Sequence, residues 1–339
     1  MSSAVTSDGA IGAARRRPTS RFLLLLILLG MFATFLGALY RRDILDWLSL
    51  RNYTPSPSVV SLASNDAMTA SATKYFYVNH PNIDEKPAFV ANCNSQTEQT
   101  IVLGCYHGNQ RGIYILSVTD PRLRGVEEVT AAHEMLHAAY DRLNASERTR
   151  VAVLLKDYYN TVHDQRIRDT IEAYKKSEPN DVVNEMHSVF GTEAAQLPPE
   201  LEAYYQRYFK NRSIVVGYAN DYAEEFASRQ KQVVAYDAQL QALKYEIDAN
   251  NLSLSNQRDS LSNQRTQLES DRSGGDARAY NARVDAYNSA VAAYNAKIVT
   301  TKQLISNYNV LVGKRNAIAL EEQALAQALS GDSVPKTAR

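Results

Sequence analysis

The sequence predicts a mainly helical α+β protein. It would have an N-terminal transmembrane helix, a small domain with a short β-sheet, and a C-terminal antiparallel coiled-coil hairpin. Three observations support this prediction: an uncharged apolar stretch near the N-terminus, two strands that lead into a helix, and heptad patterns in the last third. With 339 residues and 45% hydrophobic content, the chain can hold one compact core plus extensions.

The apolar stretch at residues 22–40 contains no charged side chain. At helical rise it spans about 28 Å, enough to cross the apolar core of a bilayer. A basic excess precedes the stretch, at Arg15, Arg16, Arg17 and Arg21. This excess predicts a cytoplasmic tail at residues 1–21 and an extracytoplasmic position for everything after the stretch. A cleaved signal peptide is the alternative, although no A-x-A cleavage site follows directly.

Composition divides the rest of the chain. Residues 41–73, rich in Ser, Thr and Ala and containing Pro55 and Pro57, are expected to form a juxtamembrane linker. A small domain follows at 74–212, then a helical hairpin at 213–330 and a flexible tail at 331–339. The chain has 37 basic and 37 acidic residues, and this balance argues against nucleic acid as a partner, because phosphate binding normally leaves a basic excess.

The small domain is expected to begin with a β-hairpin. Residues 100–107 and 111–118 read as strands joined by a turn that contains Gly108, Asn109, Gln110 and Gly112. A helix at 126–143 follows, and then a long helical run at 145–176, capped by Asn144 with Glu147 three positions on. A further helix is expected around Glu185, and another starts near Pro199.

The segment His-Glu-Met-Leu-His at 133–137 lies in the helix expected at 126–143. Positions i and i+4 share one helix face, so His133 and His137 can bind one zinc ion. Glu134 lies beside the pair, where a carboxylate can take a proton from a metal-bound water. The sequence therefore predicts a zinc hydrolase site, against the alternative that both histidines are ordinary polar residues of an amphipathic helix.

This motif and the hairpin before it resemble the zincin metallopeptidases. The resemblance implies that a sheet precedes the HExxH helix and that its edge strand lines the substrate cleft. Residues 113–116 are the candidate edge strand, and their unpaired backbone groups would bind an extended peptide by strand addition.

The third metal ligand is expected downstream. The run from Val183 to Thr192 contains an Asn-Glu pair and resembles the gluzincin branch of the zincins, which implies that Glu185 is the third ligand. By helical spacing alone, Val182, Met186, Val189 and Phe190 form one buried stripe, and Glu185 and His187 flank it on opposite sides. Either of the two could therefore face the metal. His163 and Glu193 are further alternatives.

The gluzincin resemblance has one gap. Thermolysin-like members carry an Asp four residues after the ligand, and this chain has Val189 there. The usual hydrogen-bond partner of a zinc-bound histidine is therefore not carried over. Catalysis also needs a donor for the developing oxyanion, and Tyr140, His163 and His187 are available by residue type, without one being assigned.

The chain contains two cysteines, Cys93 and Cys105, just before and inside the expected hairpin. An even pair in an exported domain predicts a disulfide, with two buried thiols as the alternative. Their spacing is too wide for a CxxC zinc knuckle.

The last third carries heptads. From Tyr280, one seam position recurs at 280, 287, 294, 301 and 308, and the other at 284, 291, 298, 305 and 312. An earlier run has seam positions from Val233 to Leu268 and turns polar at Asn250, Gln257 and Gln264. The break at residues 273–276 predicts an antiparallel hairpin with its tip near Gly274. Such a hairpin could act as a spacer, mediate self-association, bind a protein partner or brace the domain.

These features together favour a membrane-anchored, extracytoplasmic zinc metallopeptidase that acts on a peptide or protein substrate. His133, His137 and Glu185 would bind zinc, and Glu134 would act as general base. The alternative is an envelope scaffold in which the coiled coil is the functional part and the metal site is structural or inactive.

Overall fold

The computed structural model describes residues 1, 19–93, 103–108 and 111–329. This part is mainly helical with a small three-stranded sheet, which confirms the predicted fold class. The tail expected at 331–339, residues 2–18 of the expected cytoplasmic tail, residues 100–102 of the first strand, and Asn109 and Gln110 of the turn lie outside the described residues. The chain divides into two units, residues 1–54 and 55–339.

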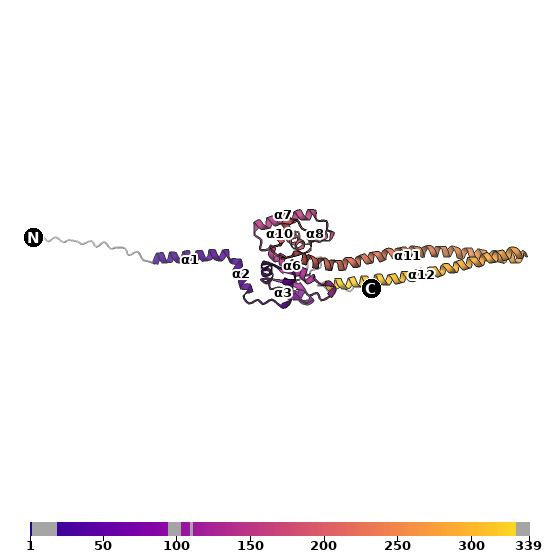
Figure 1. Ribbon diagram of the computed structural model, residues 1–339, viewed down its shortest axis with the longest axis horizontal. Helices are drawn as coiled ribbons and strands as arrows, with labels where there is room; N and C mark the ends of the chain where they lie inside the picture. Colours follow the sequence, from indigo (N-terminus) through magenta and orange to yellow (C-terminus); the bar gives the residue numbers. More distant parts are fainter. Residues whose placement is uncertain (2–18, 94–102, 109–110, 330–339) are drawn as a thin grey trace. The chain divides into compact units, whose positions relative to one another are not determined.

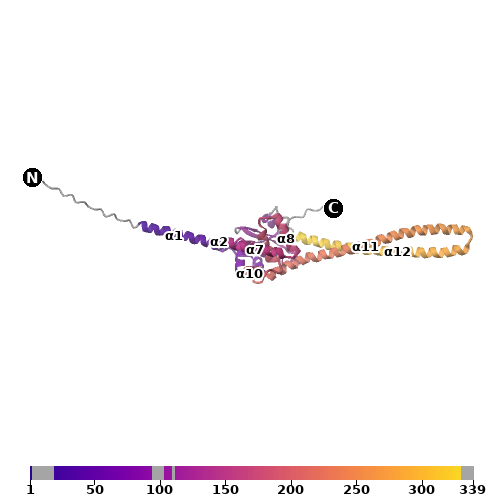
Figure 2. The same cartoon turned by 90° about the horizontal axis from the view of Figure 1, so that it is seen from above.

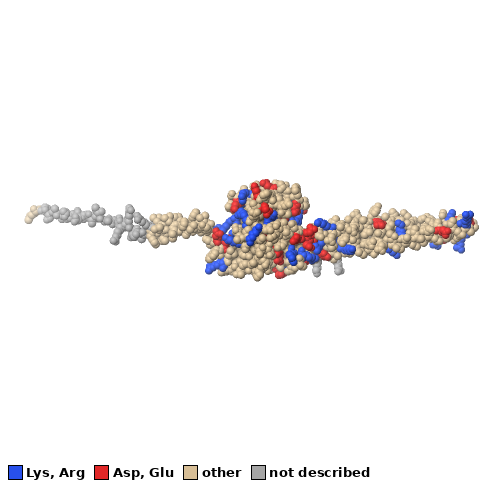
Figure 3. Space-filling model, viewed as in Figure 1, with Lys and Arg blue, Asp and Glu red and all other residues tan. Residues whose placement is uncertain are grey.

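The first unit contains the apolar helix α1 (Thr19–Leu39) and the shorter α2 (Arg41–Leu50). Residues Phe22–Leu39 are long and apolar enough to cross a membrane, a property that a signal sequence near the N-terminus shares. In Figure 3 this stretch carries neither acidic nor basic side chains, whereas charges of both signs are interspersed over the rest of the face in view.

The second unit begins with two helices that the sequence reading missed. α3 (Pro57–Asn65) and α4 (Ala70–Tyr77) start at the N-caps Ser56 and Thr69, whose side chains accept backbone hydrogen bonds. Their apolar side chains are part of the main core, including Val59, Leu62 and Phe76. The expectation of a linker at 41–73 is therefore wrong for residues 57–73, whose apolar side chains pack inside the domain, whereas residues 41–54 belong to the first unit.

The sheet has the strand order β1-β3-β2, with β1 (Asn82–Asp84) parallel and β2 (Gly104–His107) antiparallel to β3 (Gly112–Leu116). The candidate edge strand 113–116 is therefore the central strand, because β1 pairs with its second side. β1 was not predicted from the sequence. A disulfide joins Cys93, at the end of α5 (Lys86–Asn92), to Cys105 in β2, which confirms the predicted pairing.

Five helices complete the domain after the 3-10 turn Pro121–Leu123: α6 (Val126–Tyr140), α7 (Ala145–Thr161), α8 (Gln165–Ser177), α9 (Val182–Glu193) and α10 (Pro199–Tyr205). The capping box of Asn144 and Glu147 is present at the start of α7. The single helix expected at 145–176 is wrong, because the chain leaves α7 at Val162 and a new helix starts at its N-cap Asp164.

The last third forms α11 (Arg212–Gly274) and α12 (Ala277–Leu329), which run alongside each other in Figures 1 and 2. Gly275 turns the chain with a φ of 84°. Polar contacts between the arms pair Asp271 with Arg283, Asn250 with Lys297, Asp237 with Arg315 and Arg229 with Glu321. These pairs place the tip at Gly274–Gly275 and match the expected antiparallel register to within a few residues.

The base of this hairpin belongs to the domain. Val215 and Ala219 of α11 lie in the main core, and Leu325 and Leu329 of α12 pack in a second cluster with Leu123 and Val126. A domain boundary at residue 213 therefore cuts through the core, because the first turns of α11 and the last turns of α12 are buried.

Candidate metal centre

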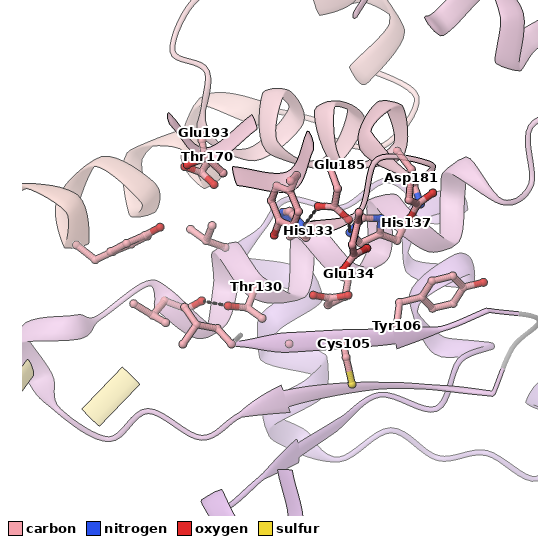
Figure 4. Close-up of a pocket in the computed structure, with 18 of the residues that line it drawn as sticks. Cys105, Tyr106, Thr130, His133, Glu134, His137, Thr170, Asp181, Glu185 and Glu193 are labelled. Carbon is pink, nitrogen blue, oxygen red and sulfur yellow. Dashed lines mark hydrogen bonds and ion pairs between the residues drawn. The ribbon is translucent and has the colours of Figure 1, made fainter. Parts of the chain in front are cut away.

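Three side chains from two helices converge beside the sheet. His133 and His137 lie one turn apart on α6, and Glu185 reaches them from α9 (Figure 4). The Nε2 atom of His133 is 3.7 Å from Oε2 of Glu185, and Nε2 of His137 is 3.5 Å from Oε1. One ligand atom from each residue lies within 4.8 Å of the others, so the group could hold a metal ion.

Small residues allow α6 and α9 to approach. A Cβ atom on Gly191 of α9 would lie 2.4 Å from Cδ1 of Leu136 and 2.8 Å from Cε1 of Tyr205. These separations are far below contact distance, so no larger residue fits without moving its neighbours. Gly191 therefore sets the spacing that brings Glu185 within reach of both histidines.

His187 lies on the other side of α9, away from the candidate ligands. It is fully buried among tyrosines, its Nε2 atom is 2.9 Å from the Tyr204 hydroxyl, and its ring contacts Tyr140 and Tyr205. Burial lowers the pKa of His187 to about 3, so the ring is neutral. The structure thus distinguishes the two alternatives that helical spacing left open for the third ligand. Glu185 faces α6, and His187 packs in the core.

The remaining sequence candidates lie elsewhere. His163 is exposed, Glu193 forms an ion pair with Arg166 at the far end of the cavity, and Tyr140 packs against His187. None of the three oxyanion candidates therefore lines the site. The tyrosine that sequence reasoning missed is Tyr174 of α8, which lines the cavity and hydrogen-bonds to Glu185.

The ionisable groups of the cluster depend on one another. Burial lowers the pKa of His133, but the hydrogen bond that its ring donates to the Glu185 carboxylate and the charges of Glu134 and Glu185 outweigh this effect and raise the pKa to about 9. Burial likewise raises the pKa of Glu185, and the two histidines and Tyr174 reverse this, leaving it below its ordinary value. Without metal, His133 and Glu185 thus form a charged pair, and once the imidazole loses its proton the same groups could serve as donors for a metal ion.

The candidate ligands open into a cavity of about 430 Å³. One wall is formed by Leu103 and by Gly104, Cys105 and Tyr106 of β2. The other walls come from α6, α8, the connection between α8 and α9, α9 itself and Tyr222 of α11. Glu134 lies between the histidines and β2 in Figure 4. A proton acceptor therefore stands at the same cavity as the three ligands, on the side of the strand.

Searches with protein-family models, curated proteins and solved structures found no match to this chain, so the geometry of the site is the basis for assigning a function.

Proposed function

We propose that this protein is a membrane-anchored zinc metallopeptidase of the gluzincin type, with its catalytic domain outside the cytoplasm. The observation that carries the proposal is the convergence of His133, His137 and Glu185 at a cavity that Glu134 also lines. Two imidazole nitrogens and one carboxylate are a donor set that catalytic zinc sites use, and three protein ligands leave one position for water.

Zinc bound by these three residues would polarise the substrate carbonyl and lower the pKa of a bound water. Glu134 is 6% exposed and faces the same space, so its carboxylate can take the proton of that water. The protonated Glu134 then delivers the proton to the leaving amine. Because Glu185 is shielded and its pKa is lowered, it remains an anion throughout.

The strand β2 would bind the substrate backbone. The backbone N–H of Leu116 donates a hydrogen bond to the carbonyl of Leu103. Because residues of an antiparallel strand point their backbone N–H and C=O groups alternately toward and away from the partner strand, those of Gly104 and Tyr106 point away from β3. Among the described strands only β3 pairs with β2, and β2 lines the cavity. An extended peptide added along this edge would lie across the metal ligands. The peptide-binding role expected at 113–116 therefore passes to β2.

Two observations support the proposed location. α1 has the length and composition of a membrane anchor, and Cys93 and Cys105 form a disulfide, a bond that persists mainly in oxidising compartments. The basic excess before α1 favours a cytoplasmic N-terminus in this proposal.

The test is metal analysis combined with a peptide-cleavage assay on the full chain in detergent. The wild type should hold one zinc per chain and cleave peptides, and Glu134→Gln should keep the zinc while cleavage falls by orders of magnitude, because only the base is removed. Folded protein without metal would overturn the proposal in favour of a scaffold. An active Glu134→Gln protein would overturn the assigned base.

A further inference from the structure

We propose that α2 lies flat on the membrane surface at the level of the lipid headgroups, with its exposed apolar side turned to the acyl chains. The inference gives a lipid partner to a helix that the proposed reaction does not use. It rests on the membrane anchor of the proposed function and is independent of metal binding and cleavage.

The apolar side of α2 is its exposed side. Four large apolar residues recur at helical spacing over about 160° of the helix circumference: Ile44, Leu45, Trp47 and Leu48. All four are between 43% and 60% exposed, whereas Asp46 on the opposite side is 1% exposed. A helix of a water-soluble domain buries its apolar side and exposes its carboxylates. Because α2 does the reverse, its exposed side suits an apolar environment.

α2 begins where the apolar helix α1 ends. At helical rise, residues Phe22–Leu39 span about 27 Å, close to the thickness of the hydrocarbon core of a bilayer. Only Tyr40 separates the two helices, with a φ of −98° and a ψ of 14°, and Figure 1 shows α2 turned away from the line of α1. The backbone N–H of Ile44 still donates a hydrogen bond to the Tyr40 carbonyl, so α2 follows α1 directly. A bilayer crossed by α1 therefore meets α2 at the boundary between acyl chains and headgroups.

The charges of α2 suit a layer of lipid phosphates. Arg41 and Arg51 lie within the arc of the apolar residues. The two carboxylates of the helix, Asp43 and Asp46, lie outside that arc. The stem of an arginine can lie along acyl chains while its guanidinium reaches the phosphates. The side of α2 that we assign to the membrane therefore carries positive charge to complement the headgroups.

Trp47 indicates the depth of the helix. Tryptophan and tyrosine are enriched at the boundary between membrane and water, because their rings are apolar and carry a polar group. Trp47 and Tyr40 are 60% and 56% exposed, and the Arg51 guanidinium lies 5.5 Å from the centre of the Trp47 ring. A tryptophan with a cation on its ring fits the headgroup level better than the bilayer centre.

Fluorescence tests this placement on the full chain, because Trp47 is the only tryptophan in the sequence. The protein is reconstituted in vesicles of phosphatidylcholine and phosphatidylglycerol and recovered by flotation. Lipids brominated just below the headgroup or near the end of the acyl chain quench from the bilayer, and acrylamide quenches from water. We expect the shallow bromines to quench Trp47 at least about 2-fold more than the deep ones, because aromatic residues of interfacial helices lie near the headgroups.

A matched pair of double variants tests the apolar side. Ile44→Ser with Leu48→Ser removes two apolar residues beside Trp47, and should raise acrylamide quenching about 3-fold or more while lowering quenching by the shallow bromines. Val153→Ser with Val234→Ser makes the same kind of change on α7 and α11, at side chains that are 53% and 57% exposed, and should behave as the wild type. Since all four replaced side chains are exposed, neither pair creates a cavity in the core.

Four results would overturn the inference, each with a different meaning. Strong acrylamide quenching with none from the brominated lipids would place α2 in water. Protection from both quenchers would show a protein contact, such as a second copy of the chain. Strongest quenching by the deep bromines would extend the membrane span into α2. Unchanged quenching in the variant with Ile44→Ser and Leu48→Ser would exclude the apolar side as the lipid contact.

Failure of this inference is distinguishable from failure of the proposed function. A chain that does not float with the vesicles would remove the anchor, and with it both the proposed location and the placement of α2. A chain that floats but lacks zinc or cleavage would overturn the peptidase alone, because the fluorescence of Trp47 depends on neither.

Discussion

A Cβ atom on Gly104 would lie 2.8 Å from Oε1 of Glu134 and 2.5 Å from Cγ2 of Thr130. The strand β2 therefore crosses α6 at the proposed base, at a distance that only glycine allows. This close approach brings the cavity wall and the proton acceptor together.

Replacing Gly104 with alanine should push Glu134 or β2 out of place. We expect cleavage to fall at least about 10-fold while zinc is retained, because the metal ligands do not touch the added methyl group. Gly108→Ala is the matched control, since its Cβ would meet only Oδ2 of Asp141, at 3.5 Å. Unchanged activity in Gly104→Ala would show that the spacing of β2 and Glu134 does not matter for catalysis.

Substitutions of Glu185 and His187, which lie on opposite sides of α9, should have different effects. Glu185→Ala should abolish stoichiometric zinc binding, because it removes one of three ligands. His187→Ala should keep the zinc but lower the free energy of unfolding by about 2 to 4 kcal/mol, since it leaves a cavity among buried tyrosines. Metal content and urea unfolding separate the two effects. Loss of zinc in His187→Ala alone would transfer the ligand role to His187.

Asp66 predicts a pH-dependent stability. It is fully buried, and neither carboxylate oxygen has a hydrogen-bond partner. Burial, and secondly the charge of Glu128, raise its pKa well above the ordinary value. The folded state thus binds the proton more tightly than the unfolded chain, so this carboxyl costs stability as pH rises from about 4 through the folded-state pKa.

Asp66→Asn should consequently stabilise the protein at pH 7, by about 1 to 3 kcal/mol, and by much less at pH 4. Urea unfolding at both pH values measures the difference, with Asp157→Asn as an exposed control. If the difference in unfolding free energy between the variant and the wild type were the same at pH 4 and pH 7, Asp66 would be paired in solution.

The helical hairpin should tolerate shortening but not removal. Asp237 and Arg315 contact each other across the arms, so replacing residues 241–311 with a short Gly-Asn turn keeps both helix bases. This variant should retain zinc and activity. Deleting 230–330 removes Leu325 and Leu329, exposes Leu123 and Val126, and should destabilise the domain by several kcal/mol. Thermal unfolding and zinc content of both variants provide the comparison, and equal stability would show that the base is a docking element only.

Patterns with a strong period predicted most of this fold. The heptads predicted both long helices and the tip, because a seam must repeat along its whole length. The heptad prediction is wrong at Ile305. This residue was expected to face the other arm but is 40% exposed, and the half-buried Leu304 takes the inward position instead. Adjacent apolar residues make that one-residue choice ambiguous in the sequence.

Short elements were harder to predict. β1 has three residues and pairs with β3 across about thirty positions of sequence; without it, β3 looks like an edge strand. The motif at 133–137 indicated directly three residues that line the candidate site, His133, Glu134 and His137. No sequence motif identifies Tyr174 or Gly104, because these residues reach the site only when α8 and β2 pack against α6 and α9.

The disulfide has a consequence for when the cavity wall is complete. Cys105 directly follows Gly104 in the strand beside Glu134, and its partner Cys93 ends α5. In a compartment that keeps thiols reduced, β2 would retain β3 and α6 as neighbours but lose its covalent tether to α5. The chain would then reach its fully braced form only after oxidation joins β2 to the end of α5.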